Sequence, residues 1–454
     1  MRAGVDVVRL NLSHGPLDEH VQRLRAVRLA ALAVGVPVAI LADLPGPKVR
    51  AGRFPDGGVA LTVGHLITMR PGTDDSDANN ITVDYPSLLL DVQEGDRIVI
   101  GDGGILLRCA SVDTDGLRAK VESGGMVQGR PGVHLPSERL RLTAPTDEDL
   151  VLAAAMAAEG VDFLGVSFVR TAADIDKVRA VVLPHTTRLV AKIETIPAVA
   201  NLAAIAAVSD AVMVARGDLG IECPLEDVPH LQKKIVRHCV EVGVPVITAT
   251  QMLESMIVAP APTRAEVSDV ANAVFDGTDA VMLSAETAIG HDPVLVVKTM
   301  AQIAERAEQE ANYAQWSARL GRVQRRHWNE STDRITMAIT HACAQAAADA
   351  GVEAILCCTK SGRTAAAMAR FRPAAKLIGV SPDPATVRSM SLTWGVTPLQ
   401  VDTYATTDAM VWHAVETAVQ RQLVSPGSVV AVLAGAPDRP SGAATDVLRL
   451  VRVQ

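Results

Sequence analysis

The hydrophobic positions from Val151 to about Glu310 form short, continuous apolar runs separated by amphipathic stretches. Such runs are typical of strands buried on both faces of a parallel sheet, and the stretches between them have helical spacing. The pattern predicts repeated strand–helix units. The strands expected in this part of the chain are Val161–Ser167, Arg188–Ile193, Asp210–Ala215, Val244–Ala249 and Asp279–Leu283.

The same rhythm occurs near the N-terminus, where strands at Val5–Leu10 and Val38–Ala42 flank a helix near Leu17–Leu32. One later helix has clear end signals. Thr263 and Glu266 form a capping box, apolar residues follow at helical spacing, and Gly277 ends the helix. In all, the pattern predicts seven strands.

Polar residues follow every one of these strands. A single polar end is uninformative, but seven in the same orientation predict an α/β fold of the (β/α)8 TIM-type, whose strands share one mouth. A closed barrel needs eight strands, so one βα unit is missing from the pattern. The residues at the strand ends are Asn11 with Ser13, Asp43, Ser167, Lys192 with Glu194, Asp218, Thr250, and Ser284 with Glu286.

Two segments depart from this rhythm. Residues 47–140 are rich in Gly, Pro, Asp, Val and Thr, and Ile98–Arg108 alternates around Gly103-Gly104, which predicts a small inserted β domain. Its flanks, Pro45–Pro47 and Ala144-Pro145, resemble hinges. Residues 321–454 predict an open α/β domain, with a helix near Asp333–Asp349 and a strand at Ala354–Cys358. The barrel is then built from residues 1–46 and 141–320.

Composition narrows the class of protein. The chain has 454 residues and a net charge of −8, which argues against a general nucleic-acid binder. No apolar run reaches the ~18 residues of a membrane span, and no secretory signal pattern begins the chain. The six cysteines have no metal-type spacing, so we expect reduced thiols, a structural role for Cys357 and Cys358, and a cytoplasmic location.

The segment from Arg188 to Asp218 carries the chemistry. One strand ends in Lys192 and Glu194, and the next ends in Arg216, Gly217 and Asp218. In a parallel barrel these ends lie side by side at the mouth. Two carboxylates and a lysine there suit a divalent metal beside a transferring phosphoryl group.

Six strings in fixed order now resemble the pyruvate kinase family. They are RLNLSHG at Arg9–Gly15, AKIET at Ala191–Thr195, MVARGDLGIE at Met213–Glu222, TATQMLESM at Thr248–Met256, PTRAEVSDVANAV with its following DG at Pro262–Gly277, and MLSAET at Met282–Thr287. The resemblance extends to the C-terminal string PSGAATDVLRLVRV. It implies transfer of a phosphoryl group from phosphoenolpyruvate to ADP, with Mg²⁺ or Mn²⁺ as cofactor, in a homotetramer.

The resemblance also implies roles at matching positions. Glu194 and Asp218 match the divalent-metal ligands, Lys192 the lysine that neutralises the moving phosphoryl group, and Arg9 the arginine that holds the substrate phosphate. The turn Ala215, Arg216, Gly217 and Asp218 matches the backbone site for the substrate carboxylate. The residues that match positions near the methylene carbon are Thr250, Ser284 and Glu286, and those that match nucleotide contacts are His14 and Arg50.

Each assignment has a structural alternative. Arg9 could form only a salt bridge, Thr250 and Ser284 could be helix caps, and His14 could be a loop residue without a ligand. The string Thr359, Lys360, Ser361, Gly362, Arg363 and Thr364 resembles the family loop for phosphorylated effectors, although it could also be an unregulated turn.

Three departures from the family pattern matter. The first βα unit is absent, so we expect Met1 to be a mis-assigned start and an upstream extension of roughly 20–30 residues to stabilise the barrel. Arg130-Pro131 replaces a lysine pair before GVHLP. Lys48 stands where K⁺-dependent members carry glutamate, so we expect no K⁺ requirement. The positions that match the K⁺ site of the family are Asn11, Ser13, Asp43 and Leu44. We expect the polar side chains among them, Asn11, Ser13 and Asp43, to contact Lys48 or solvent instead of K⁺.

Two other functions remain open at this point. One is a metal-dependent lyase of the wider phosphoenolpyruvate/pyruvate barrel group, although the inserted and C-terminal domains argue against it. The other is a non-catalytic paralogue that binds an effector or partner, although Arg9, Lys192, Glu194, Asp218 and Thr250 are all retained.

Overall fold

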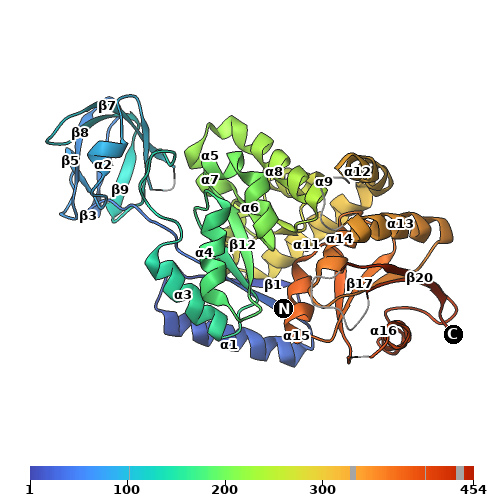
Figure 1. Ribbon diagram of the computed structural model, residues 1–454. Helices are drawn as coiled ribbons and strands as arrows, with labels where there is room; N and C mark the ends of the chain where they lie inside the picture. Colours follow the sequence, from blue (N-terminus) through green and yellow to red (C-terminus); the bar gives the residue numbers. More distant parts are fainter. Residues whose placement is uncertain (102, 328–333, 404, 436–443) are drawn as a thin grey trace.

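A computed structural model describes residues 1–454 except 102, 328–333, 404 and 436–443. It has three parts, with a β-rich domain at one side, a parallel barrel sheet in the middle and an α/β domain at the other side (Figure 1). We call residues 47–140 the lid domain and residues 321–454 the C-terminal domain.

The barrel sheet has seven parallel strands in the order β1-β2-β11-β12-β13-β14-β15, and β1 and β15 are its edge strands. The predicted TIM-type arrangement is therefore confirmed, with seven of its strands in the described part of the chain. Most predicted boundaries differ by a residue or two from the strands, which are β1 (Val7–Asn11), β2 (Ala39–Asp43), β11 (Phe163–Val166), β12 (Arg188–Ile193), β13 (Ala211–Ala215), β14 (Val246–Ala249) and β15 (Ala280–Val281).

Helices cover the outside of this sheet. The predicted capping box is present, because the Thr263 side chain accepts from the Glu266 N–H, and Gly277 ends the helix with φ +100°. The helices are α1 (Leu17–Val34), α3 (Asp147–Ala158), α4 (Ala172–Val182), α5 (Ile196–Ala200), α6 (Leu202–Val208), α7 (Arg216–Glu222), α8 (Val228–Val242), α9 (Arg264–Asp276), α10 (Ala285–Ala288) and α11 (Pro293–Glu310), with 3-10 turns η1 (Leu225–Asp227) and η2 (Glu254–Ile257).

The lid domain is built from two antiparallel-rich sheets around a core of its own. In the alternating segment around Gly103-Gly104, β6 pairs with β7 in antiparallel register. Its elements are β3 (Phe54–Leu61), β4 (Leu66–Pro71), β5 (Asn80–Val83), α2 (Leu88–Asp91), β6 (Arg97–Ile100), β7 (Ile105–Val112), β8 (Leu117–Ser123), β9 (Gly125–Gly129) and β10 (Val133–His134).

The C-terminal domain has an open sheet in the order β18-β17-β16-β19-β20, in which only β20 is antiparallel. The expected helix at Asp333 begins at Arg334, since residue 333 lies outside the described residues. Helix α12 (Tyr313–His327) leads from the barrel into this domain, whose further elements are α13 (Arg334–Ala350), β16 (Ala354–Cys358), α14 (Arg363–Ala369), β17 (Lys376–Ser381), α15 (Pro384–Ser389), η3 (Met390–Leu392), β18 (Val396–Gln400), α16 (Thr407–Gln420), β19 (Val429–Ala434) and β20 (Val447–Arg452).

The C-terminal domain packs against the floor of the barrel, where the strands begin. Leu392 of η3 joins the apolar cluster inside the barrel, which includes Leu41, Phe163 and Met213. The barrel mouth, where the strands end, faces away from this contact. All six cysteines are free and buried, and Cys357 and Cys358 lie in the buried strand β16, as expected of structural thiols. No helix in the described part of the chain has the length and apolar character to cross a bilayer.

Candidate active site

The centre of the mouth is a buried lysine between two carboxylates. The Lys192 Nζ lies 3.0 Å from Asp43 Oδ1 and 2.9 Å from Glu194 Oε1. It also donates a 2.6 Å hydrogen bond to Ser167 Oγ. These residues end β2, β11 and β12, which are neighbours in the sheet. The shared direction of parallel strands therefore brings together side chains that are far apart in the sequence.

Electrostatics in this cluster depend on burial. Burial opposes the charge of Lys192, but the carboxylates of Asp43, Glu194 and Asp218 outweigh it and raise the pKa of the ammonium group. Burial raises the pKa of Glu194 to about 7, with a further contribution from the charge of Asp218 and an opposing one from Lys192. Burial also acts on Asp43, but Lys192 and Arg9 hold the pKa of its carboxyl below the usual value. The lysine thus remains charged at neutral pH.

Arg9 reaches the same cluster from β1. Its Nε donates a 2.8 Å hydrogen bond to Asp43 Oδ2, and its Nη2 lies 2.6 Å from that oxygen. The salt bridge considered as an alternative role is therefore formed. The side chain is still 23% exposed, so the guanidinium borders both the buried carboxylate and the open mouth.

The expectation for Asp43 and Lys48 was wrong. Asp43 contacts Arg9 and Lys192 instead of Lys48 or solvent, because the carboxylate is only 1% exposed and both cations lie beside it. Asn11 Oδ1 accepts from the Ser13 N–H, and Leu44 is buried. Lys48 is open to solvent and forms no ion pair within the described ranges. Local burial, Arg50 and Lys192 nevertheless lower the pKa of Lys48, while Asp218 and Asp43 act against them.

The two candidate metal ligands differ in their environment. Glu194 Oε2 accepts a 2.6 Å hydrogen bond from the Phe168 N–H, whereas the buried Oε1 lies 2.9 Å from the Lys192 ammonium. Asp218, half-buried in α7, is close enough for its charge to raise the pKa of Glu194.

These two carboxylates fit a Mg²⁺ or Mn²⁺ site that relies on substrate and water for the remaining ligands. The described residues contain no group of three or more His, Cys, Asp or Glu arranged to hold a metal. Mg²⁺ is commonly bound by one or two carboxylates together with substrate phosphates. Glu194 and Asp218 supply the carboxylate oxygens that such a site uses.

The start of α7 is fixed by Arg216 and Thr250. Arg216 Nη1 lies 2.8 and 2.6 Å from the two carboxylate oxygens of Asp269, and its Nε donates to Ala249 O at 3.1 Å. The Gly217 N–H donates to Thr250 Oγ1 at 2.8 Å. The Arg216 side chain therefore anchors the turn to α9 and β14, and Ala215 and Asp218 flank the anchored residues.

Thr250, Ser284 and Glu286 form the opposite side of the mouth. Thr250 has φ +70°, an unfavourable conformation for a β-branched residue, and its Oγ1 donates to Ala249 O at 2.6 Å. Glu286 is buried, and its oxygens accept from the Ser284 N–H at 2.6 Å and the Leu253 N–H at 3.2 Å. Glu286 thus ties together the loops that follow β14 and β15.

The nucleotide candidates lie farther out. His14 is exposed on the loop after β1, and its N–H donates to Asn11 O at 3.4 Å. Arg50 Nη1 donates to Arg130 O at 3.1 Å. This hydrogen bond links the start of the lid domain to Arg130-Pro131, the residues that replace the lysine pair of the family. The structure therefore places Arg50 with the lid domain and leaves His14 beside the barrel.

Comparison with known proteins gives the family. The family model "Pyruvate kinase, barrel domain" matches residues 1–297, and "Pyruvate kinase, alpha/beta domain" matches residues 337–451. The chain belongs to the pyruvate kinase family. The family is one of phosphotransferases, so this assignment also gives the class of enzyme.

Curated relatives agree over nearly the whole chain. A pyruvate kinase of Geobacillus stearothermophilus is 41% identical over 97% of this chain and 75% of its own length. One of Clostridium acetobutylicum is 37% identical over 100% of this chain and 95% of its own length. "Pyruvate kinase 2" of Synechocystis sp. is 40% identical over 99% and 75%.

The candidate effector loop of this pyruvate kinase family member is docked on the barrel. Arg188 Nη2 donates to Ser361 O at 2.8 Å, and Thr386 Oγ1 donates to Lys360 O at 2.9 Å. Thr359 Oγ1 accepts from the Gly362 N–H at 3.0 Å. α14 begins at Arg363, and the next residue, Thr364, has its Oγ1 2.7 Å from Thr445 Oγ1. The loop is therefore linked to the first residue of β12.

Sequence reasoning missed three contributors to this site. Ser167 bonds Lys192, and its place at a strand end was visible in the sequence. The Phe168 N–H, on a residue with φ +54°, bonds Glu194, but backbone geometry at this turn has no sequence signal. Asp269 anchors Arg216 from α9, and only the fold shows which of the many helix carboxylates does so.

Proposed function

We propose that this chain transfers the phosphoryl group of phosphoenolpyruvate to ADP, giving pyruvate and ATP. The observation that carries the proposal is the buried Lys192 ammonium between Asp43 and Glu194, with Asp218 nearby, in a member of this family. A preorganised cation in a water-poor mouth stabilises negative charge far better than it would in water.

We assign the residues as follows. Arg9 holds the substrate phosphate, the start of α7 receives the substrate carboxylate, and Lys192 offsets charge on the phosphoryl group during transfer. Glu194 and Asp218 would hold Mg²⁺ or Mn²⁺, which neutralises phosphate charge when bound. Thr250 is our candidate for the hydroxyl beside the methylene carbon, where the enolate is protonated. Ser284 and Glu286 support that wall of the mouth.

ADP would lie between the barrel and the lid domain, near Arg50 and His14. The lid domain already contacts α7, since Ser137 Oγ donates to Glu222 Oε2 and Arg97 Nη1 donates to Cys223 O at 3.5 Å. Closure on the flanking hinges would exclude water from the reacting groups.

The test is turnover by the purified chain with phosphoenolpyruvate, ADP and Mg²⁺. Formation of ATP and pyruvate in equal amounts is the expected result. Pyruvate without ATP would support a lyase, and no product from a folded protein would support a non-catalytic paralogue.

We also propose that K⁺ is not required, because Lys48 supplies positive charge near Asp43 and Asp218. The rate should be unchanged when K⁺ replaces tetramethylammonium at constant ionic strength. Strong activation by K⁺ would refute this. Homotetrameric assembly and a phosphorylated effector at Thr359–Thr364 are proposals on family grounds. Light scattering tests the first, and loss of activation in Lys360→Ala with Arg363→Ala tests the second.

A further inference from the structure

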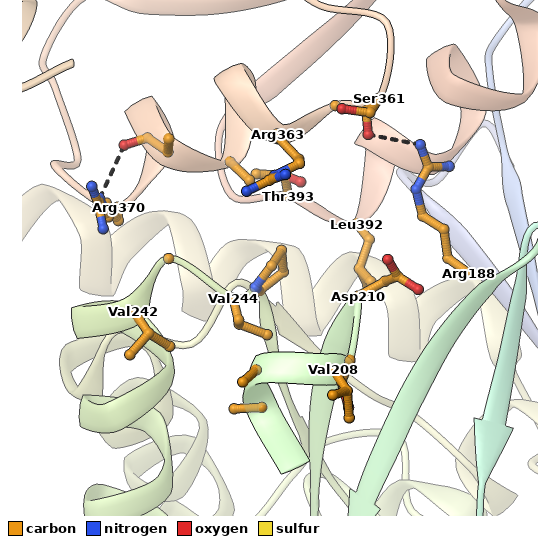
Figure 2. A pocket seen from close by; sticks show the side chains of 18 of the residues that line it. Arg188, Val208, Asp210, Val242, Val244, Ser361, Arg363, Arg370, Leu392 and Thr393 are labelled. Atoms are coloured by element: carbon orange, nitrogen blue, oxygen red, sulfur yellow. Dashed lines mark hydrogen bonds between the residues drawn. The ribbon is translucent and has the colours of Figure 1, made fainter. Parts of the chain in front are cut away.

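The barrel is joined in different ways to its two neighbouring domains. At the floor, a cavity of about 1060 Å³ lies beneath the C-terminal domain, and the hydrogen bond from Arg188 to Ser361 spans it at one side (Figure 2). At the mouth, two short connections lead to the lid domain. We call residues 44–46 the entry connection and residues 141–146 the exit connection. Both contact the turn Ser167–Arg170, which follows β11.

The entry connection is bonded to the residue that holds Lys192. Ser167 Oγ donates to Leu44 O at 2.7 Å and accepts from Lys192 Nζ at 2.6 Å. Gly46 packs against the same turn with φ +68°, and a Cβ added there would lie 2.7 Å from Phe168 Cδ2 and 2.8 Å from Ser167 Cβ. Both distances are too short for a real side-chain carbon, so only glycine permits this approach.

The exit connection reaches the same turn through Arg170. The Arg170 Nη1 donates to Leu140 O at 2.9 Å, and its Nη2 donates to Leu142 O. Two residues earlier in the chain, the Phe168 N–H donates to Glu194 Oε2 at 2.6 Å. The turn therefore contacts both lid connections on one side and bonds the lysine and the glutamate of the mouth on the other.

Asp149 fixes the two connections to each other. Its side chain is 1% exposed, its Oδ1 accepts from the Gly46 N–H at 3.0 Å, and its Oδ2 accepts from the Thr146 N–H at 2.9 Å. The Asp149 N–H also donates to Thr146 Oγ1 at 3.1 Å, which completes a capping box at the start of α3. The capping box needs only Thr146. The bond to Gly46, 103 residues away in the chain, exceeds what a helix cap requires.

We propose that Asp149 is a positioning residue for the mouth. It holds the entry and exit connections at one point, and the entry connection keeps Ser167 and Phe168 where they bond Lys192 and Glu194. A buried carboxylate that accepts from two backbone N–H groups is a strong constraint on both segments. Without it, the turn loses its support and the two charged groups lose their fixed places. The effect on rate rests on the proposed function, whereas the effect on the turn does not.

The first test is amide hydrogen exchange of the purified full chain, measured by mass spectrometry. In Asp149→Asn a side-chain amide replaces the carboxylate, so only one of the two N–H groups keeps an acceptor. The peptides that contain Gly46 and Phe168 should exchange at least about tenfold faster than in the parent. Glu266→Gln is the matched control, because Glu266 completes the capping box of α9 and accepts from the Ser255 N–H at 2.7 Å. It should leave both peptides unchanged.

Binding of Mn²⁺ without substrates gives a second readout that needs no turnover. Followed by electron paramagnetic resonance, it should weaken about tenfold in Asp149→Asn, because Glu194 is one proposed ligand. Gly46→Ala disturbs the same turn from the entry connection while the Asp149 carboxylate stays, and it should weaken Mn²⁺ binding as well. In turnover, Asp149→Asn should lower kcat and raise the KM for ADP, whereas Glu266→Gln should change neither.

Two results would overturn the proposal. One is parent-like exchange of the Phe168 peptide in Asp149→Asn, which would leave Asp149 as a helix cap only. The other is faster exchange with parent-like Mn²⁺ affinity, because the turn would then not position Glu194. Melting curves identify a variant that fails to fold, and Gly46→Ala then decides by the same two measurements. If the parent binds no Mn²⁺ without substrate, exchange at Phe168 decides alone. An inactive parent that shows these differences would sink only the proposed function.

Discussion

Both ends of the barrel carry buried carboxylates paired with cations, but the hydrogen bonds of these carboxylates differ between the two ends. At the mouth, Lys192 is shared between Asp43 and Glu194, and among the described residues no backbone N–H bonds Glu194 Oε1. At the floor, Asp162, Asp210 and Asp279 each bind at least one arginine and one strand N–H. The carboxylates at the floor are therefore already occupied by partners within the protein. This difference indicates that the mouth serves the reaction, whereas the floor serves stability.

The floor aspartates also attach the C-terminal domain. Asp162 accepts from Arg388 Nε at 2.8 Å, and Asp279 lies 3.3 Å from Arg372 Nη1. Arg372 is almost completely buried, and its guanidinium stacks 4.6 Å from the Trp394 ring. If the comparison is right, variants at the mouth should affect rate and variants at the floor should affect stability.

The largest effect should come from Lys192→Met. Losing one preorganised cation should lower kcat by about 10³ or more, because charge on the phosphoryl group is no longer offset. Arg9 remains on Asp43, so circular dichroism should show a folded protein. Pyruvate formation by the purified variant is the measurement. Near-parental turnover would remove the mouth from the mechanism.

Arg372→Gln should have the opposite profile. Breaking a buried ion pair should cost about 3 kcal/mol and lower the melting temperature, while kcat per folded molecule stays near the parent value. The matched control is Arg449→Gln, which removes an exposed C-terminal-domain ion pair with Asp408 and should change the melting temperature little. A large loss of kcat without loss of stability would show that the floor also contributes directly to the reaction.

Asp218→Asn tests whether the carboxylates at the mouth bind the divalent metal. It removes one negative ligand, so the Mg²⁺ concentration for half-maximal rate should rise about tenfold or more. A Mg²⁺ titration of the rate measures this. An unchanged titration would show that Asp218 is not a ligand.

A smaller, pH-dependent effect is expected at the lid contact. Burial raises the pKa of Glu222 from 4.5 to about 7, with the Ser137 hydrogen bond acting against it. Between these values the folded state keeps a proton that the unfolded state has released. Stability from this group is therefore lost as pH rises to about 7, and the cost persists above it.

Glu222→Gln removes that cost. Its melting temperature should exceed that of the parent by a few degrees at pH 8 and match it near pH 4.5. Exposed Glu226→Gln is the control and should show no such pH dependence. A difference that is equal at both pH values would contradict the assignment.

The sequence predicted the seven strands and the polar residues at their ends, because continuous apolar runs and strand-end chemistry are local signals. It did not predict which charges pair. Asp43 was expected near Lys48, but sheet curvature places it between Arg9 and Lys192. Asp210 and Asp279 were counted as strand residues, yet each precedes its strand and holds a neighbour. Such pairings depend on tertiary geometry that no local pattern encodes.

The floor aspartates also have a consequence for local unfolding. Each of them lies just before a strand, and its carboxylate accepts a hydrogen bond from a backbone N–H of the neighbouring strand. Asp162 in this way joins β11 to Ile40 of β2, Asp210 joins β13 to Leu189 of β12, and Asp279 joins β15 to Val246 of β14. The barrel is thus fastened in pairs of strands. Native-state hydrogen exchange should then show both strands of a pair opening with one free energy, and Asp210→Asn should expose the amides of β12 together with those of β13.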